Sequence, residues 1–439
     1  MTTNRLGPIW LNTGVTRTNA LTYLYASFFT IGFVSFMSFM QPYVLAENLN
    51  IPQDQQGGAT GMLSFSYELV MVFLIAPMGA LADKIGRRPI YVIGFLWLGA
   101  ALAIFPLAQN LTQLVMGRMF FAVGAAAITA MMATVLADYP QERSRGVLVA
   151  VAGIANGFGA MTLVIVLSRL PVIFADQGYS TLTSGRMTFW VATCLCVVTA
   201  FIVGRGLQPG KPGKQQTEAL PRLMQQAVRA ARKNPRIAVA CLGAFVARGD
   251  LVVISTYFSL WATQTGQLQG LRLEEAIRTA AMFLIIIQGS SVLWAPIWGF
   301  VLDRWDRLTA VWVALLIAAV AYFWVGFSPS PIVSAFIPAA ILLGIGEFSA
   351  IMSGAALIGQ SAPVDIRGSV LGLFNFCGSI GILCITLIGG IVFDAWMPGA
   401  PFVVVGALNL FVCLVALLVR RRVGYASPRD RPGEPVNGS

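Results

Sequence analysis

The sequence contains no histidine, and only 11% of its 439 residues are Asp, Glu, Lys or Arg. Without histidine the chain lacks the usual near-neutral general base, the commonest metal ligand and the usual pH sensor, so any proton chemistry has to use carboxylates. A soluble domain carries roughly a quarter of charged residues. This shortage of charge, together with 57% apolar residues, excludes a soluble enzyme and indicates a chain surrounded by lipid.

Residue patterns for a metal site, a structural disulfide or ATP use are lacking as well. The six cysteines lie in apolar stretches, form no CxxC pair and have no histidine to complete a zinc site. They are interpreted as small apolar residues of helices, and we expect neither a metal nor a cofactor. The chain has no Walker loop. Residues 1–19 lack the apolar region of a cleavable secretory signal.

Long apolar runs make up most of the chain. A helix needs about 20 apolar residues to cross a bilayer, and only helices or closed barrels satisfy their backbone groups in lipid. The runs do not alternate as barrel strands do. They therefore predict twelve transmembrane helices, at approximately 20–44, 58–82, 88–107, 111–137, 147–171, 187–208, 237–263, 278–302, 308–328, 331–357, 369–392 and 400–419.

The basic residues predict how these helices are oriented. With the N-terminus inside, 23 of the 29 Lys and Arg fall on the inner side, as the positive-inside rule requires. The net charge of +11 is then a topology signal rather than a surface for nucleic acid, so we expect no nucleic-acid partner. Both termini are predicted to be cytoplasmic in a multi-pass protein of a bacterial inner (plasma) membrane.

An internal repeat divides the chain into two halves. Residues 79–87 and 299–307, which are 220 positions apart, share their Gly, their Asp and their final Arg, and such duplication is how many transporters are built. The linker between the halves is basic and has apolar residues at helical spacing, which predicts an amphipathic helix either on the inner leaflet or in solvent. The predicted segments are a cytoplasmic tail 1–19, a six-helix bundle 20–208, a basic cytoplasmic linker 209–236, a second six-helix bundle 237–419 and a cytoplasmic tail 420–439.

The segment Gly79-Ala-Leu-Ala-Asp-Lys-Ile-Gly-Arg-Arg-Pro resembles the signature G-x-L-a-D-R-x-G-R-R of the major facilitator superfamily of secondary transporters. The resemblance covers nearly the whole chain. It implies an all-α fold of two six-helix bundles that rock about a central site lined by spans 1, 4, 7 and 10. The residues that it implies for gating are Gly79, Asp83, Lys84, Gly86, Arg87, Arg88 and Asp138, with Asp303 and Arg307 in the second copy.

The residue types of this signature suit a gate. Gly79 and Gly86 allow close helix approach and a tight turn. Asp83 suits the positive end of a neighbouring helix, by family analogy span eleven, and Arg87 is placed to pair with Asp138. The alternative is that these charges only anchor a loop at the membrane surface.

Two further family motifs match less fully. Arg118 followed by Gly124 resembles the R-x-x-x-x-x-G motif of proton-coupled members. In the fifth span Gly153 and Gly157 fit the antiporter motif, but Phe158 replaces its Pro. This departure puts export by antiport in doubt.

Ionisable residues inside the spans are costly and call for an explanation. Arg248 and Asp250 are two residues apart and cannot share one face of a regular helix. Arg248 could pair with Asp250 or Glu347 and leave the other carboxylate free to carry a proton, or the pair could only fix helix packing. Tyr257 and Trp261 share the stripe of Asp250 and are candidate residues of a substrate cavity. The five residues concerned are Glu68, Arg118, Arg248, Asp250 and Glu347.

These residues favour a proton-coupled secondary carrier of a small organic solute that works by alternating access. Asp250, Glu347 or Glu68 would bind the driving proton, although the residues are also compatible with Na⁺. Arg118 or Arg248 would hold an anionic group or switch the carboxylate. We favour export of amphipathic, drug-like compounds, with proton-coupled import of an organic anion as the alternative. A transporter-like receptor or assembly factor belongs to a different class. The expected partners are the organic substrate, protons and membrane lipid, and the expected state is a monomer that is not an enzyme.

Overall fold

A computed structural model describes residues 5–141, 144–209, 220–363 and 366–424. Within these residues, 12 helices are long and apolar enough to cross a membrane, which confirms the predicted number. The first four residues, residues 210–219 of the predicted linker and the predicted C-terminal tail beyond residue 424 lie outside the described residues.

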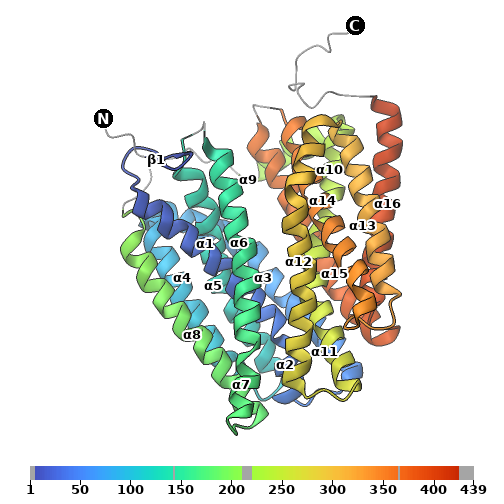
Figure 1. The fold of residues 1–439 in the computed structure, drawn as a ribbon. Coiled ribbons are helices and arrows are strands. Elements are labelled where there is room, and N and C mark those ends of the chain that lie inside the picture. The colour runs from blue at the N-terminus through green and yellow to red at the C-terminus, as the bar shows by residue number, and fades with distance from the viewer. Residues whose placement is uncertain (1–4, 142–143, 210–219, 364–365, 425–439) are drawn as a thin grey trace. The chain divides into compact units, whose positions relative to one another are not determined.

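The chain divides into two compact units (Figure 1). Unit 1 comprises Met1–Gln215 together with Gly266–Met282, and unit 2 comprises Gln216–Thr265 together with Phe283–Ser439. The elements before the linker are the strands β1 Arg5–Leu6 and β2 Ile9–Trp10, the 3₁₀ helices η1 Gln53–Gln55 and η2 Phe105–Leu107, and the α-helices α1 Arg17–Phe39, α2 Gln41–Glu47, α3 Gln56–Ile85, α4 Arg87–Ile104, α5 Leu111–Asp138, α6 Arg145–Ser168, α7 Leu170–Asp176 and α8 Thr181–Gly206.

The second half is helical throughout its described residues. The α11–α12 turn falls within the segment that groups with unit 1. The elements are α9 Leu220–Lys233, α10 Pro235–Val252, the π-helix η4 Val253–Tyr257, α11 Phe258–Leu268, α12 Leu273–Arg304, α13 Arg307–Gly326, the 3₁₀ helix η5 Ser334–Phe336, α14 Ile337–Ser361, α15 Arg367–Ala395 and α16 Ala400–Val423.

The two units pack their spans in the same pairs. In each, the first span packs on the fifth (α1 on α6, α10 on α15), and the third packs on the fourth and sixth (α4 on α5 and α8, α13 on α14 and α16). Glycine permits the first of these contacts, because a Cβ at Gly159 of α6 would overlap the carbonyl of Phe28, and one at Gly381 of α15 would overlap that of Phe245. The interhelical contact of each unit therefore depends on a missing side chain.

The N-terminal arm, residues 5–12, is not the polar tail that the sequence suggests. Its strands β1 and β2 pair with each other, and Leu11 bridges to Pro140 in the α5–α6 turn. The Asn12 amide donates to the Tyr139 carbonyl at 2.9 Å, and the Gln141 amide donates to the Trp10 carbonyl at 2.8 Å. The arm is therefore a folded part of unit 1.

The predicted amphipathic helix of the linker is present as α9, and it packs against α15 and α10 of unit 2. Ala227 faces inward and is fully buried, whereas Arg229, Arg232 and Lys233 are exposed. The sequence predicted that this helix lies on the inner leaflet or in solvent. In the structure, the apolar side of α9 that contains Ala227 packs on other helices of unit 2.

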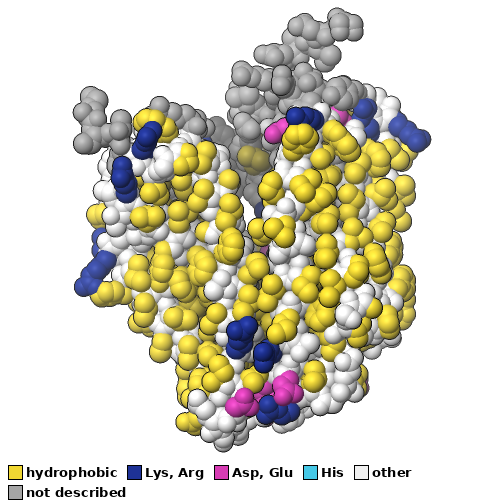
Figure 2. Space-filling view, viewed as in Figure 1, with side chains coloured by type: hydrophobic (Ala, Val, Ile, Leu, Met, Phe, Trp, Pro, Cys, Tyr) yellow, Lys and Arg dark blue, Asp and Glu magenta, His cyan; other side chains and the backbone are white. Residues whose placement is uncertain are grey.

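Figure 2 shows how side chains are distributed on one face. Apolar side chains cover the middle of each unit, and Lys and Arg gather near the ends. This pattern is the one that a lipid-embedded protein requires, since charge is costly at the bilayer centre.

Candidate functional site

The charges of the family signature form a three-residue network in unit 1. Arg87, the first residue of α4, donates to the Asp83 carboxylate at 2.7 Å and to the Asp138 carboxylate at 2.8 Å. The predicted Arg87–Asp138 pair is therefore confirmed. Both acids are partly exposed, with side-chain exposures of 50% for Asp83 and 36% for Asp138, so solvent screens the network and its bonds can be exchanged.

The two signature glycines have different roles. Gly86 lies between α3 and α4 with a φ of 104°, which only glycine adopts readily, so the predicted tight turn is present. A Cβ at Gly79 would meet no described atom within 4 Å. The predicted close helix approach at Gly79 is therefore not made within the described residues of unit 1.

The corresponding end of unit 2 uses a different acid. The charged groups of Asp303 and Arg307, the gating residues of the second copy, are 3.9 Å apart, and the Asp303 side chain is 81% exposed. Asp306 is instead buried, and it contacts Arg236 at 3.3 Å and Arg420 at 3.0 Å. Asp306 thus links the first span of unit 2 to its last span. We call Asp306, Arg236 and Arg420 the Asp306 clamp. Asp306 also caps α13 by accepting the Thr309 amide at 2.9 Å.

Two buried carboxylates lie in the middle of unit 2. Asp250 of α10 is fully buried, and Asn409 of α16 donates to its two oxygens at 3.3 and 3.2 Å. Glu347 of α14 is 4% exposed, and its Oε2 has no hydrogen-bond partner among the described residues. The buried Tyr322 hydroxyl of α13 interacts electrostatically with both acids, and the acids interact with each other. We call Asp250, Tyr322, Glu347 and Asn409 the acid cluster.

Arg248 lies outside the acid cluster. Its guanidinium donates to Asn375 of α15 at 2.6 Å, and its side chain fills the space that Gly378 leaves open. Asp250 points instead to α16, which confirms that residues two apart cannot share a face. Arg248 thus bonds to an amide of α15, and its pairing with Asp250 or Glu347 stays a prediction. The span departs from a regular α-helix at Val253–Tyr257, directly after α10.

Tyr257 and Trp261, the candidate cavity residues, belong to the packing of unit 2. Tyr257 is fully buried and donates to the Thr386 carbonyl. Trp261 is 5% exposed and contacts the rings of Phe336 and Phe402. In this conformation neither side chain is open to a solute.

The middle of unit 1 holds a buried cation. Arg118 of α5 is 1% exposed, donates to Ser38 at 2.8 Å and lies 4.7 Å from the ring of Tyr67. Its Nε and Nη1 have no hydrogen-bond partner among the described residues. Glu68, the predicted acid of α3, is 9% exposed and next to Tyr67 in the sequence. The aromatic contact is worth about 2 kcal/mol when desolvated, which offsets only part of the cost of burying the charge.

The described residues contain no group of three or more His, Cys, Asp or Glu that could hold a metal ion. The chemistry open to this arrangement is therefore proton exchange at the buried acids, anion binding by Arg118 and rearrangement of the ion pairs at the signature turn.

Sequence reasoning missed several residues of these sites. Asn409 and Tyr322 are uncharged and lie in apolar runs, so nothing in the local sequence relates them to Asp250. Asp306 could have been recognised from the sequence as a helix cap, since an Asp three residues before Thr309 fits the N-cap pattern. Its two arginines lie 70 and 114 positions away in the sequence, so only the fold brings them together.

Comparisons with known proteins agree with this architecture. Residues 22–383 and 277–438 match the sequence model of the Major Facilitator Superfamily. Magnetosome protein MamH of Paramagnetospirillum magneticum is 27% identical over 411 residues, which cover 92% of this chain and 93% of that protein. Magnetosome protein MamZ of the same organism is 26% identical over 388 residues, and the match spans 59% of its length.

Solved structures show the same fold at low sequence identity. A bacterial homologue of the human lysosomal transporter Spinster superposes with a TM-score of 0.72 at 15% identity, over 96% of this chain and all of that chain. The nucleoside transporter NupG gives a TM-score of 0.70 at 15% identity, over 91% of this chain and 98% of that chain. With a family match across most of its length and twelve apolar helices, the chain is an integral membrane protein that belongs to the Major Facilitator Superfamily of secondary transporters.

Proposed function

We propose that this transporter is proton-coupled, that it works by alternating access and that it exports small amphipathic organic compounds. The acid cluster of unit 2 carries the proposal. Asp250 and Glu347 are both at least 95% buried and interact with each other, and the hydrogen-bond donor to Asp250 is the uncharged Asn409. Two adjacent carboxylates in such a site cannot both be ionised without a large cost, so the pair retains a proton.

Release of that proton would require water or a cation to reach the cluster. Four helices supply its members, so a change in the packing of unit 2 during transport would change the solvation of both acids. This is how conformation and proton occupancy become linked, because a proton that binds one conformation more tightly shifts the population towards it. The oxygen atoms of this cluster could also bind Na⁺, so H⁺ as the coupling ion is part of the proposal.

The network of Arg87 supports a gate at the signature turn. Its two acids come from the end of α3 and the end of α5, so any relative movement of these helices changes the ion pairs. We further propose that this end and both termini face the cytoplasm of a plasma membrane, which the distribution of Lys and Arg supports.

Export of amphipathic compounds is supported by some relatives. Multidrug transporter protein MdtP of Bacillus subtilis is 27% identical to this chain, but over 167 residues that cover 37% of it. The alternative of an imported organic anion is favoured by Arg118, whose two unbonded nitrogens could receive a carboxylate. Vesicles with the proton gradient imposed in one direction or in the other distinguish export from import. A proton-coupled exporter and a proton-coupled importer accumulate the same solute under opposite gradients.

The membrane of a specialised organelle is a second candidate location for this transporter. The relatives matched over 86 to 92% of the chain are named as magnetosome proteins, and the matches to drug transporters are shorter. Expression of a fluorescent fusion in Paramagnetospirillum magneticum, followed by isolation of magnetosome membranes, tests this setting. Enrichment of the fusion in these membranes favours it, and uniform labelling of the cell membrane opposes it. Capture of a partner protein without any solute flux would favour the receptor or assembly role instead.

The central experiment measures uptake of amphipathic dyes and organic acids into proteoliposomes driven by a pH gradient. We expect Asp250→Asn and Glu347→Gln each to lower gradient-driven transport at least tenfold, while exchange of solute without a gradient continues. The control is Asp54→Asn, which removes an exposed carboxylate of η1 and should leave the rate unchanged. Full gradient-driven accumulation in both cluster variants would disprove proton coupling through these acids.

A further inference from the structure

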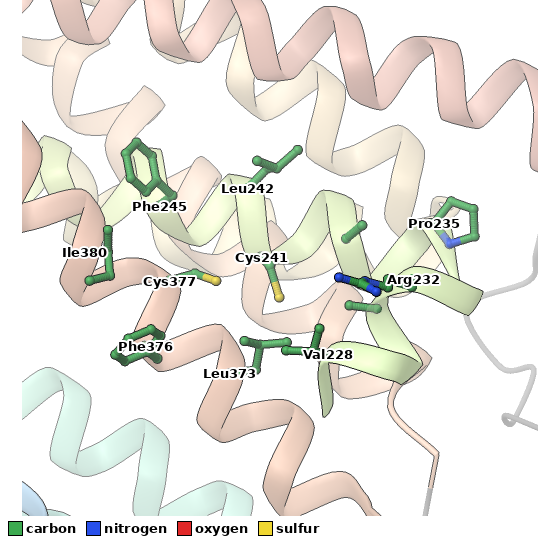
Figure 3. A pocket seen from close by; sticks show the side chains of 12 residues that line it. Val228, Arg232, Pro235, Cys241, Leu242, Phe245, Leu373, Phe376, Cys377 and Ile380 are labelled. Carbon is green, nitrogen blue, oxygen red and sulfur yellow. The ribbon is translucent and has the colours of Figure 1, made fainter. Parts of the chain in front are cut away.

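The cleft where α9 covers α10 and α15 contains two thiols of unit 2. It has a volume of about 670 Å³, and its wall is mostly apolar. Cys241 of α10 and Cys377 of α15 both line it, and Arg232 of α9 lines it as well (Figure 3). The acid cluster and the signature network have no residue in this wall.

The two thiols are neighbours in this wall. They come from helices that pack on each other, and Figure 3 shows the Cys377 side chain pointing towards Cys241. Both are free cysteines in this structure. Cys413, by contrast, donates to the backbone carbonyl of Trp312 at 3.2 Å. Cys194 and Cys196 lie two apart on α8 and point to different sides of it.

We propose that Cys241 and Cys377 form a redox-active dithiol, which a hydroperoxide oxidises to a disulfide between α10 and α15. The cleft gives a small oxidant access to both sulfur atoms, and the packing of α10 on α15 places one cysteine near the other before any reaction. The Arg232 guanidinium adds positive charge to the same wall, which favours the thiolate that reacts with peroxide.

The chemistry balances with the hydroperoxide as the sole co-reactant. One thiolate attacks the terminal oxygen of ROOH, the O–O bond breaks and the alcohol ROH leaves, which gives a sulfenic acid. The second thiol attacks the sulfenyl sulfur, an S–S bond forms, and the hydroxyl leaves as water with the proton of that thiol. Two thiols lose two electrons in total and the peroxide gains them. A thiol reductant reverses the reaction by exchange through a mixed disulfide.

The disulfide would hold together two helices that already pack closely. Arg248 of α10 bonds Asn375 of α15, and Gly381 of α15 lies against the backbone of α10 at Phe245. A crosslink therefore fits the packing seen here but prevents the two helices from sliding. Because Cys241 lies nine residues before Asp250 on the same helix, we infer that the crosslink restrains the helix that carries the acid cluster. This consequence for transport rests on the proposed function, whereas the thiol chemistry does not.

The test counts thiols in the purified full-length protein. After treatment with hydrogen peroxide the protein is denatured and labelled with N-ethylmaleimide. The reduced protein has six cysteines to label, and we expect four labels after oxidation, six again after dithiothreitol, and a peptide that joins Cys241 to Cys377. Retention of six labels, or a crosslink between other cysteines, would overturn the proposal.

Three variants make the result specific. Cys194→Ser removes an exposed thiol and should keep the crosslink. Cys241→Ser and Cys377→Ser should each abolish it, and in at least one of them a sulfenic acid should be trapped by dimedone on the cysteine that remains. A crosslink that persists in either variant contradicts the assignment.

A transport assay on the same samples tests the restraint. Oxidation should slow transport by wild-type protein at least threefold, reductant should restore the rate, and Cys241→Ser should be unaffected by peroxide. If no solute is transported at all, the thiol counts still decide the dithiol proposal. If crosslinked protein transports at the full rate, the restraint is wrong and the proposed carrier function is unaffected.

Discussion

The two units repeat one apolar scaffold but place their charges differently. In unit 1 the ion pairs of the signature turn are partly exposed around Arg87, and its middle contains the buried Arg118 and the acid Glu68. In unit 2 the corresponding turn has a buried acid, Asp306, held by two arginines. Its middle contains the acids Asp250 and Glu347. Duplication has preserved the packing of helices, while the ionisable residues have diverged.

This difference suggests a division of labour between the units. Exposed ion pairs are weak and easily exchanged, which suits a gate, whereas breaking a buried pair leaves an uncompensated charge and costs several kcal/mol. We therefore propose that the turn of unit 2 stays fixed during transport and that the turn of unit 1 rearranges. The following predictions test that contrast, and they begin with the largest effect.

Removal of Asp306, the acid of the Asp306 clamp, should lower the stability of the protein more than the other changes. Asp306→Ala leaves Arg236 and Arg420 without their common partner and removes the cap of α13, so we expect a loss of about 3 kcal/mol in the free energy of unfolding. Chemical unfolding in mixed micelles measures it. The control Asp303→Ala removes an acid that is 81% exposed and should change stability by less than about 0.5 kcal/mol. Equal losses in the two variants would contradict the contrast.

The next largest loss of stability should come from the glycine contact between the first and fifth spans, and it should be equal in the two units. Gly159→Ala and Gly381→Ala each place a methyl group against a backbone carbonyl of the partner helix, so we expect each to cost about 2 kcal/mol by overpacking. Thermal unfolding followed by circular dichroism is the measurement. Gly153→Ala and Gly372→Ala lie on the same two helices with nothing within 4 Å of the new methyl, and these controls should be neutral or slightly stabilising.

The helices could be predicted from the sequence because lipid imposes a simple length rule on apolar runs. The repeated signature at residues 79–87 and 299–307 likewise predicted two halves, because its Gly, its Asp and its final Arg recur at an offset of 220 residues. The π-helix at Val253–Tyr257 could not be predicted, because nothing in the composition of the span departs from that of an α-helix. Its irregularity depends on packing against other spans.

The gate in unit 1 should show a functional rather than a structural effect. Arg87→Gln breaks the pairs with Asp83 and Asp138, and we expect transport to fall about tenfold, which equals about 1.4 kcal/mol, while stability changes by less than about 1 kcal/mol. The matched change in the second copy, Arg307→Gln, should lower transport less than twofold. A similar loss of transport in both variants would mean that both turns act as gates.

The candidate sites were predictable only in part, for a physical reason. Charge inside an apolar run is visible in sequence, so Asp250 and Glu347 could be identified as unusual. Which residue pairs with a buried charge depends on how the helices pack. Uncharged partners such as Asn409 therefore cannot be identified from the sequence. The same limit explains why the N-terminal arm was interpreted as a tail, because its backbone bonds join groups more than 120 residues apart.

The smallest expected effect concerns the segments that precede the first span of each unit. In unit 1 the N-terminal arm bonds to the α5–α6 turn, and in unit 2 α9 packs on α10 and α15. Asn12→Ala removes side-chain bonds to the carbonyls of Asp138 at 2.8 Å and Pro140 at 3.2 Å, and we expect a loss of about 1 kcal/mol. Hydrogen exchange at the Gln141 amide, which donates to the arm, should become faster.

The matched control for the arm is Asn110→Ala, which removes the cap of α5 and should cost a similar amount of stability. Because that cap lies at the opposite end of α5 from the Asp138 turn, exchange at Gln141 should stay slow, and exchange in α9 should be unchanged in both variants. Faster exchange at Gln141 in Asn12→Ala alone would show that the arm holds the turn from which Asp138 reaches Arg87. Unchanged exchange in Asn12→Ala would show that the turn is held without the arm, and that the gate of unit 1 depends on its ion pairs only.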